Sequence, residues 1–128
     1  MKFLYISDLD GTLLDNCGIF PDNDKFKINE LIKSGLLFTI ATARTFATVI
    51  PLLDGVNINC PIILMNGVMI YDLGKKIPID LESIPDNAVQ NVLACLKKHD
   101  VTGFIYTWNN KMTAWYEKFA VAPMKTFY

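Results

Sequence analysis

Hydrophobic and polar positions alternate in blocks along the first 72 residues of the chain. Three short runs are apolar at consecutive positions, as is typical of buried parallel strands: residues 3–6, 36–41 and 61–65. Two stretches between them carry apolar residues at helical spacing: residues 21–34, which Gly35 ends, and residues 45–53, where Pro51 weakens the pattern. Strands that alternate with helices imply right-handed crossovers, so we predict an α/β fold with a parallel sheet.

The pattern changes character from about residue 75 onwards. Residues 75–81 are predicted to be extended, and residues 85–99 to form an amphipathic helix. Asn109-Asn110 is typical of a hairpin turn between two β-rich runs, at 102–108 and 111–116. A helix followed by an antiparallel hairpin begins an α+β unit. We therefore predict two domains, an α/β core over 1–78 and the start of an α+β domain over 79–128.

The composition and the charge exclude several classes of protein. The residues AVILMFWYC make up 52% of the 128, so a packed core is expected and disorder is excluded. No apolar run reaches the ~18 residues of a membrane helix, and no basic run accompanies the net charge of −1, which argues against membrane and nucleic-acid partners. The three cysteines lack metal-binding spacing and are typical of a reducing compartment, so we expect a cytoplasmic protein.

Polar side chains follow each of the three predicted strands of the first domain. Asp8 and Asp10 follow the first strand, Thr42 follows the second and Asn66 follows the third. Ligands of open α/β sheets bind outside the carboxyl ends of the strands. Adjacent parallel strands would therefore bring these four residues into one crevice.

The two aspartates leave several chemistries open. Separated by one residue of extended backbone, Asp8 and Asp10 point the same way and repel each other unless a cation lies between them or one is protonated. Mg²⁺ suits such oxygen ligands, and one carboxylate can equally act as a nucleophile while the other transfers protons. Gly11 lets backbone N–H groups approach an anion, and the Thr42 hydroxyl can donate to a phosphoryl oxygen. Taken alone, the pair could also serve only to shape a turn.

A longer motif favours the catalytic alternatives. The segment Asp8–Leu14 (DLDGTLL) behind a hydrophobic strand resembles the first motif of the haloacid-dehalogenase (HAD) superfamily. The segment Ile40–Arg44 (IATAR) is similar to the second motif of the Cof-type branch, with Ala43 where that branch usually has glycine. The segment Ile63–Gly67 (ILMNG) resembles the Asn-Gly segment of the same branch. Because the cap domain of that branch follows, the resemblance extends over the whole chain and implies a HAD-like Rossmannoid sheet followed by the start of a cap.

The resemblance implies a Mg²⁺-dependent phosphatase that works through an aspartyl-phosphate. Asp8 would attack phosphorus, and Asp10 would protonate the leaving oxygen and then activate water. The Asp8 carboxylate and the Asp10 main-chain carbonyl would hold Mg²⁺, and Thr42 would hold the transferred phosphoryl group. Six further residues would also bind the phosphate or the substrate: Leu9, Gly11, Thr12, Arg44, Asn66 and Gly67. For Arg44, an exposed position at a helix start is the simpler alternative.

Two parts of the family's site have no counterpart in this sequence. The resemblance implies a lysine that neutralises phosphate charge and a Gly-Asp-x-x-Asn-Asp-like metal segment, both beyond the cap. We therefore expect an N-terminal portion of a longer phosphatase that is weak or inactive alone; a binding module without hydrolase activity is the alternative. A receiver domain would need an aspartate where Asn66 lies, and a P-type ATPase motif would continue Asp-Lys-Thr-Gly, so both are disfavoured.

The expected ligand is a small phosphorylated metabolite, with sugar phosphates as the default class. The sequence does not identify the substrate further. Without later strands, one edge of the sheet would stay unpaired and apolar faces would stay uncovered. Self-association is therefore also expected.

Overall fold

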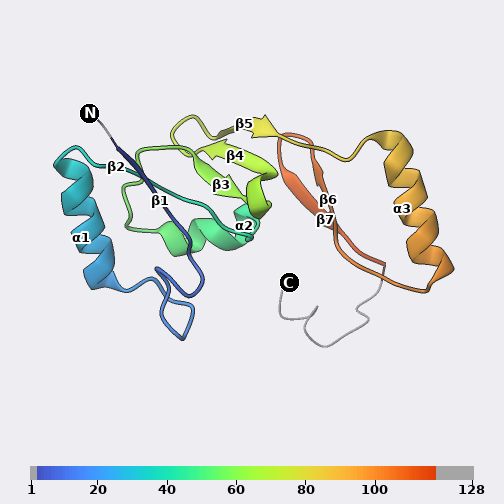
Figure 1. Cartoon of the computed structure of the whole chain (residues 1–128), viewed down its shortest axis with the longest axis horizontal. Coiled ribbons are helices and arrows are strands. Elements are labelled where there is room, and N and C mark those ends of the chain that lie inside the picture. Colours follow the sequence, from blue (N-terminus) through green and yellow to red (C-terminus); the bar gives the residue numbers. More distant parts are fainter. Residues whose placement is uncertain (1–2, 118–128) are drawn as a thin grey trace. The chain divides into compact units, whose positions relative to one another are not determined.

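A computed structural model describes residues 3–117, and the contacts within the chain divide it after Glu82 into two units. Each unit contains helices and strands (Figure 1). All the buried side chains among the described residues belong to the first unit. None of the helices in residues 3–117 is both long and apolar enough to cross a membrane. The predicted domain boundary at residue 78 stays a prediction.

A pair of parallel strands begins the first unit. β1 (Leu4–Ser7) pairs with β2 (Leu37–Ile40), and the helix α1 (Asp22–Lys33) connects them. The helix ends where Gly35 adopts a φ of 101°, a conformation that glycine reaches without steric cost. The predicted order of strand, helix and strand is therefore confirmed.

A third strand continues the parallel arrangement only briefly. β3 (Ile62–Leu64) meets the end of β2 through an isolated parallel bridge between Ala41 and Ile63. The helix predicted over 45–53 consists of two short pieces, α2 (Phe46–Val49) and the 3₁₀ turn η1 (Ile50–Leu53). The α-helix gives way to the tighter turn at Pro51, because proline has no N–H to continue the helical hydrogen bonds.

The prediction of a parallel sheet fails for the second half of this unit. β3 pairs antiparallel with β4 (Met69–Asp72), which pairs antiparallel with β5 (Ile77–Leu81). No sequence-based prediction covers β4. The Asn66-Gly67 pair, which follows the third predicted strand, reverses the chain within the turn η2 (Met65–Gly67), because both residues adopt positive φ angles of 58° and 92°.

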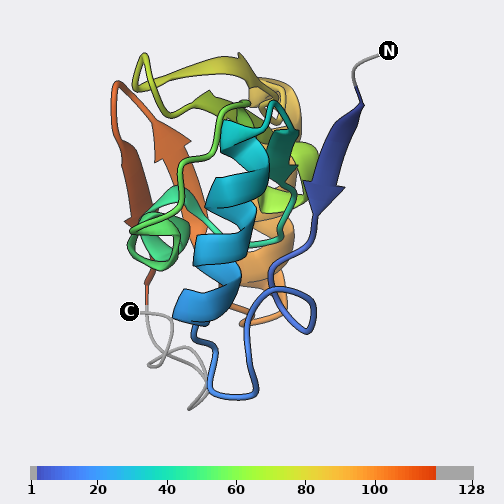
Figure 2. The same cartoon turned by 90° about the vertical axis from the view of Figure 1, so that its left-hand side faces the viewer.

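The core of the first unit lies around β2, β3 and β4. Six apolar side chains have no exposed surface: Leu9, Ile40, Val49, Ile62, Leu64 and Met69. β1 lies instead at the edge of the unit (Figure 2), and Phe3 and Ile6 are 61% and 52% exposed. The prediction that this apolar run is buried is therefore wrong, since β1 pairs with β2 alone and its other edge carries no strand in the described residues.

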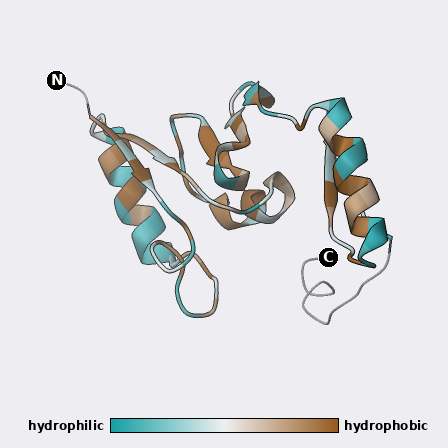
Figure 3. Cartoon of the chain, turned by 45° about the vertical axis from the view of Figure 1, so that its right-hand side comes forward, coloured by the Kyte–Doolittle hydropathy of each residue, from teal (hydrophilic) through white to brown (hydrophobic). Residues whose placement is uncertain are grey.

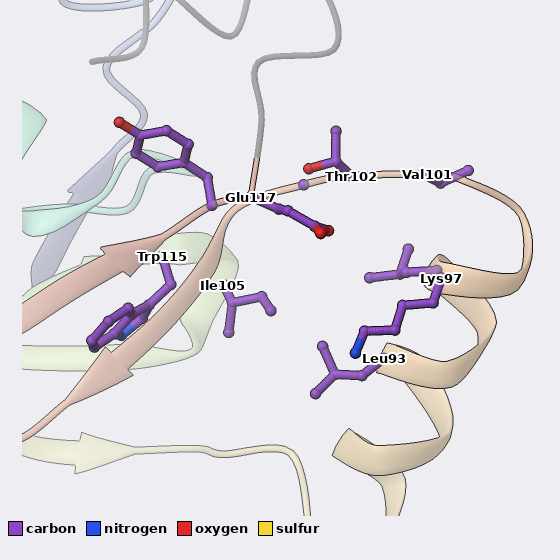
Figure 4. A pocket seen from close by; sticks show the side chains of 10 residues that line it. Leu93, Lys97, Val101, Thr102, Ile105, Trp115 and Glu117 are labelled. Atoms are coloured by element: carbon purple, nitrogen blue, oxygen red, sulfur yellow. The ribbon is translucent and has the colours of Figure 1, made fainter.

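The second unit is a helix followed by a hairpin, as predicted. α3 (Asp86–Lys98) precedes β6 (Ile105–Trp108) and β7 (Met112–Trp115), which pair antiparallel. Hydrophobic and hydrophilic residues alternate around α3 in bands (Figure 3). Leu93 of the helix and Ile105 of the hairpin border a hollow of about 200 Å³ between these elements (Figure 4). None of the residues 83–117 is buried, so the apolar face of α3 is only partly covered.

Candidate active site

The loop that follows β1 winds around one backbone carbonyl. The Leu9 carbonyl accepts hydrogen bonds of 3.0–3.2 Å from the N–H groups of residues 12–14, and the Leu9 side chain is fully buried. Gly11 permits this turn, because its φ of 74° lies in the left-handed region that side chains disfavour. The buried Leu9 thus separates two exposed carboxylates, those of Asp8 and Asp10.

Thr42 lies where β2 leaves the sheet. Its side chain is buried, its N–H donates to the Ile63 carbonyl at 3.0 Å, and its carbonyl accepts from the Asn66 N–H at 3.2 Å. The Thr42 hydroxyl oxygen accepts a hydrogen bond from the Arg44 N–H at 3.2 Å. These bonds join the ends of β2 and β3, so the threonine and the asparagine predicted from separate motifs are neighbours.

The turn after β3 has an unusual backbone conformation. Met65, Asn66 and Gly67 have successive φ angles of 53°, 58° and 92°. Left-handed backbone is costly for residues with side chains, and such residues persist only where the surroundings hold them. Here the Met65 N–H donates to the Arg44 carbonyl at 3.1 Å, which adds to the bond between Asn66 and Thr42. The loop after β2 therefore holds the turn after β3 in place.

The ends of β1, β2 and β3 surround one hollow of about 460 Å³. Eight residues line it: Asp8, Asp10, Ala41, Thr42, Ala43, Ile63, Asn66 and Gly67. Five of the nine predicted site residues are in this set. The hollow combines two carboxylates, a hydroxyl and an amide with small apolar side chains, and this arrangement suits a polar ligand that brings a cation with it.

Asp10 and Arg44 form a two-point ion pair. Arg44 Nε donates to Asp10 Oδ2 at 2.8 Å, and Arg44 Nη2 donates to Asp10 Oδ1 at 2.6 Å. The hydrogen bonds from Arg44 lower the pKa of the Asp10 carboxyl, and the same bonds raise the pKa of the guanidinium. Asp10 is therefore a carboxylate at neutral pH. Arg44 is not among the residues that line the hollow.

The other predicted residues belong to the loop after β1 and do not line the hollow. The Leu9 N–H donates to Asp8 Oδ1 at 2.7 Å, and the Thr12 N–H donates to the Leu9 carbonyl at 3.2 Å. Together with Gly11, these residues shape the loop. Three lining residues were not predicted as site residues, although each lies beside a predicted strand end: Ala41, Ala43 and Ile63.

The oxygen atoms at the hollow suit a hard divalent cation such as Mg²⁺. Asp8 and Asp10 both line the hollow, and both Asp10 carboxylate oxygens accept hydrogen bonds from Arg44. Within residues 3–117, no three His, Cys, Asp or Glu side chains are grouped so that they could hold a metal ion. The donor set therefore fits Mg²⁺ only if water and ligand oxygens complete its coordination shell.

Family comparison identifies the chain. The family of haloacid dehalogenase-like hydrolases matches residues 5–125, which is almost the whole chain. The chain belongs to this family. The resemblance to the HAD superfamily is thereby confirmed, and the matched segment includes every residue that lines the hollow.

Curated relatives of this HAD chain are longer proteins. A Buchnera aphidicola protein named as a proposed phosphatase is 34% identical over 117 residues, which cover 91% of this chain and 42% of the relative. The 5-amino-6-(5-phospho-D-ribitylamino)uracil phosphatase YwtE of Bacillus subtilis is 39% identical over 77 residues, which cover 60% of this chain and 26% of the relative. The chain thus spans less than half the length of these relatives.

The fold also matches a solved structure of the family. A haloacid dehalogenase-like hydrolase from Bacteroides thetaiotaomicron superposes with a TM-score of 0.77 at 18% identity, covering 99% of this chain and 48% of that chain. At this identity the likeness concerns the fold alone. The described architecture, a small parallel sheet with antiparallel sheets after it, is therefore that of a HAD-like protein.

Proposed function

We propose that this chain carries the phosphoryl-accepting part of a Mg²⁺-dependent phosphatase site for small phosphorylated metabolites, with sugar phosphates as the expected class. One observation carries the proposal: two carboxylates, a hydroxyl and an amide from three separate strand ends line a single hollow in a HAD-family chain. The phosphatase names of the curated relatives support the reaction type.

In the first step, an Asp8 carboxylate oxygen attacks the phosphorus atom of the substrate. The bond between phosphorus and the ester oxygen breaks, and an acyl phosphate forms on Asp8. Proton transfer to the leaving oxygen requires the protonated form of Asp10, which lines the same hollow and is the minor form while Arg44 is paired with it. The Thr42 hydroxyl, buried at the end of β2, donates to an oxygen of the transferred group.

In the second step, water attacks the phosphorus atom of the aspartyl-phosphate. Asp10 accepts a proton from this water, inorganic phosphate leaves, and the Asp8 carboxylate is restored. The pair with Arg44 favours the ionised form of Asp10, which is the form that accepts the proton. When bound by the Asp8 carboxylate and the Asp10 carbonyl, Mg²⁺ supplies positive charge against the phosphoryl oxygens.

Turnover by the 128-residue chain is expected to be weak or absent. The eight lining residues include no lysine or arginine, and the Arg44 guanidinium is already paired with Asp10, so negative charge that develops on the phosphoryl group meets no unpaired cationic side chain among the lining residues. Electrostatic stabilisation of this kind is worth about 10²–10³ in rate for one removed donor. The same observation favours the second candidate function, a HAD-fold module that binds phosphorylated ligands without hydrolysing them.

Hydrolysis of a generic aryl phosphate, with and without Mg²⁺, tests the proposal. We expect any turnover to require Mg²⁺ and to disappear in Asp8→Asn, while Asp54→Asn, which removes the same charge at an exposed position, leaves it unchanged. Turnover that persists in Asp8→Asn would contradict the assigned nucleophile. Robust turnover by the unmodified chain would contradict the expected weakness.

A further inference from the structure

We propose that Arg44 is a positioning residue, whose guanidinium fixes the orientation in which Asp10 faces the hollow before a ligand arrives. The inference rests on the proposed function, in which Asp10 is the group that transfers protons. It gives Arg44 a role different from the substrate contact that the sequence resemblance implies.

The contact between Arg44 and Asp10 restricts rotation of the carboxylate. Nε and Nη2 of Arg44 approach different Asp10 oxygens, at 2.8 Å and 2.6 Å. A single hydrogen bond leaves a carboxylate free to turn, whereas two parallel bonds to a planar guanidinium select one orientation. A lysine would supply the charge without this selection, because its ammonium is a compact point charge.

Asp10 keeps the capacity to act on the hollow while it is paired. A carboxylate offers about four lone-pair directions, and the pair uses only two of them. Asp10 lines the hollow, whereas Arg44 does not. On this proposal, Arg44 acts on a ligand through Asp10.

The main chain of Arg44 is anchored within its own loop and to the turn after β3. Its N–H donates to Thr42 Oγ1 at 3.2 Å, and its carbonyl accepts from the Met65 N–H at 3.1 Å. Together with the pair to Asp10, these bonds connect the loops after β1, β2 and β3 through one residue. The guanidinium thus extends from a fixed backbone position, as a positioning group requires.

Arg44 is the only arginine in the 128 residues, so its Nε–Hε signal in a ¹⁵N-labelled sample of the full chain is assigned without comparison variants. We expect this proton to exchange with water at least about fivefold more slowly than an unpaired guanidinium, as befits an ion pair at a partly exposed site. Asp10→Asn should abolish the protection, and Asp54→Asn should preserve it. An unprotected proton, or protection that survives Asp10→Asn, would overturn the proposal.

Arg44→Lys distinguishes the effect of the guanidinium from the effect of the main-chain hydrogen bonds, because the variant keeps the charge and both main-chain bonds. We expect the amide signals of Asp10 and Gly11 to shift and those of Met65 and Asn66 to stay. The reverse pattern would mean that Arg44 only supports the turn after β3, and would overturn the positioning role.

Inorganic phosphate with MgCl₂ completes the experiment on the full chain. A positioning role predicts that the Thr42 and Asn66 amide signals shift while the Arg44 Nε–Hε signal keeps its protection and its dependence on Asp10. Loss of that dependence on adding phosphate would make Arg44 a ligand contact and overturn the inference. Absence of any shift at Thr42 and Asn66 would instead count against the proposed function. The exchange data would still test the ion pair between Arg44 and Asp10.

Discussion

The two units of the chain contain similar elements, but within residues 3–117 only the first has a core. Around β2, β3 and β4, side chains such as Leu64 and Met69 are completely buried. In residues 83–117 no side chain is buried, and the apolar Trp115 is 59% exposed. The difference lies in the number of layers, because a single helix and a two-stranded hairpin cannot enclose a side chain from all directions.

The comparison shows where a precise site can be built. The hollow lined by Asp8, Thr42 and Asn66 belongs to the unit whose strand ends are joined by backbone hydrogen bonds. The hollow beside Leu93 and Ile105 lies between elements without a buried anchor. Catalytic groups need rigid supports, so we place the proposed chemistry in the first unit.

The largest expected effect comes from removing a core side chain of the first unit. Leu64→Ala should lower the free energy of unfolding by about 2–5 kcal/mol, because it leaves a cavity among fully buried neighbours. The matched change Leu93→Ala, at a half-buried position of α3, should cost less than about 1 kcal/mol. Urea unfolding followed by far-ultraviolet circular dichroism measures both. Equal losses would remove the contrast between the units.

A second expectation concerns the open edge of β1. Leu4 is 51% exposed on a strand with one neighbour, so this edge should mediate self-association. Leu4→Lys should weaken association at least about tenfold, since a charge at the centre of an apolar contact is costly. Ile84→Lys, at a position of the second unit that is 62% exposed, is the control and should change the association little.

Light scattering over a wide concentration range distinguishes these outcomes. Growth of the apparent mass with concentration is expected for the unmodified chain and for Ile84→Lys. A monodisperse monomer at all concentrations would contradict the role of β1. Equal effects of both lysine variants would place the contact elsewhere.

A smaller effect is expected at the end of α1. Gly35→Ala should cost about 1 kcal/mol, because Gly35 has a φ of 101° that alanine adopts only under strain. Gly103→Ala in the second unit should change stability by less than about 0.5 kcal/mol, since Gly103 lacks a positive φ and has open space around it. Thermal unfolding measures both. A loss at Gly103 as large as that at Gly35 would contradict this assignment.

Sequence periodicity predicted those elements whose pattern is local. The strand before Asp8, the helix that Gly35 ends and the Asn109-Asn110 hairpin were all identified in this way. The gathering of Asp8, Thr42 and Asn66 at one hollow followed from a general rule about strand ends. The predicted burial of β1 was wrong, because an apolar run does not reveal how many strands flank it.

Two features depended on contacts that no local pattern contains. β4 remained unpredicted although Asn66-Gly67 is a strong hairpin signal, because the same dipeptide also suits the end of a parallel strand. Arg44 contacts Asp10 across 34 positions of sequence, and only the meeting of two strand ends brings them together. The role that we propose for Arg44 therefore depends on the three-dimensional arrangement.

Phosphorylation of Asp8 is the most direct test of the central claim, that the hollow after β1 accepts a phosphoryl group. The full chain is incubated with acetyl phosphate and MgCl₂, quenched in acid and analysed by intact mass spectrometry and peptide mapping. We predict one Mg²⁺-dependent phosphoryl group on Asp8, absent from Asp8→Asn and retained in Asp54→Asn. An unmodified chain, or a phosphoryl group that persists in Asp8→Asn, would contradict the claim.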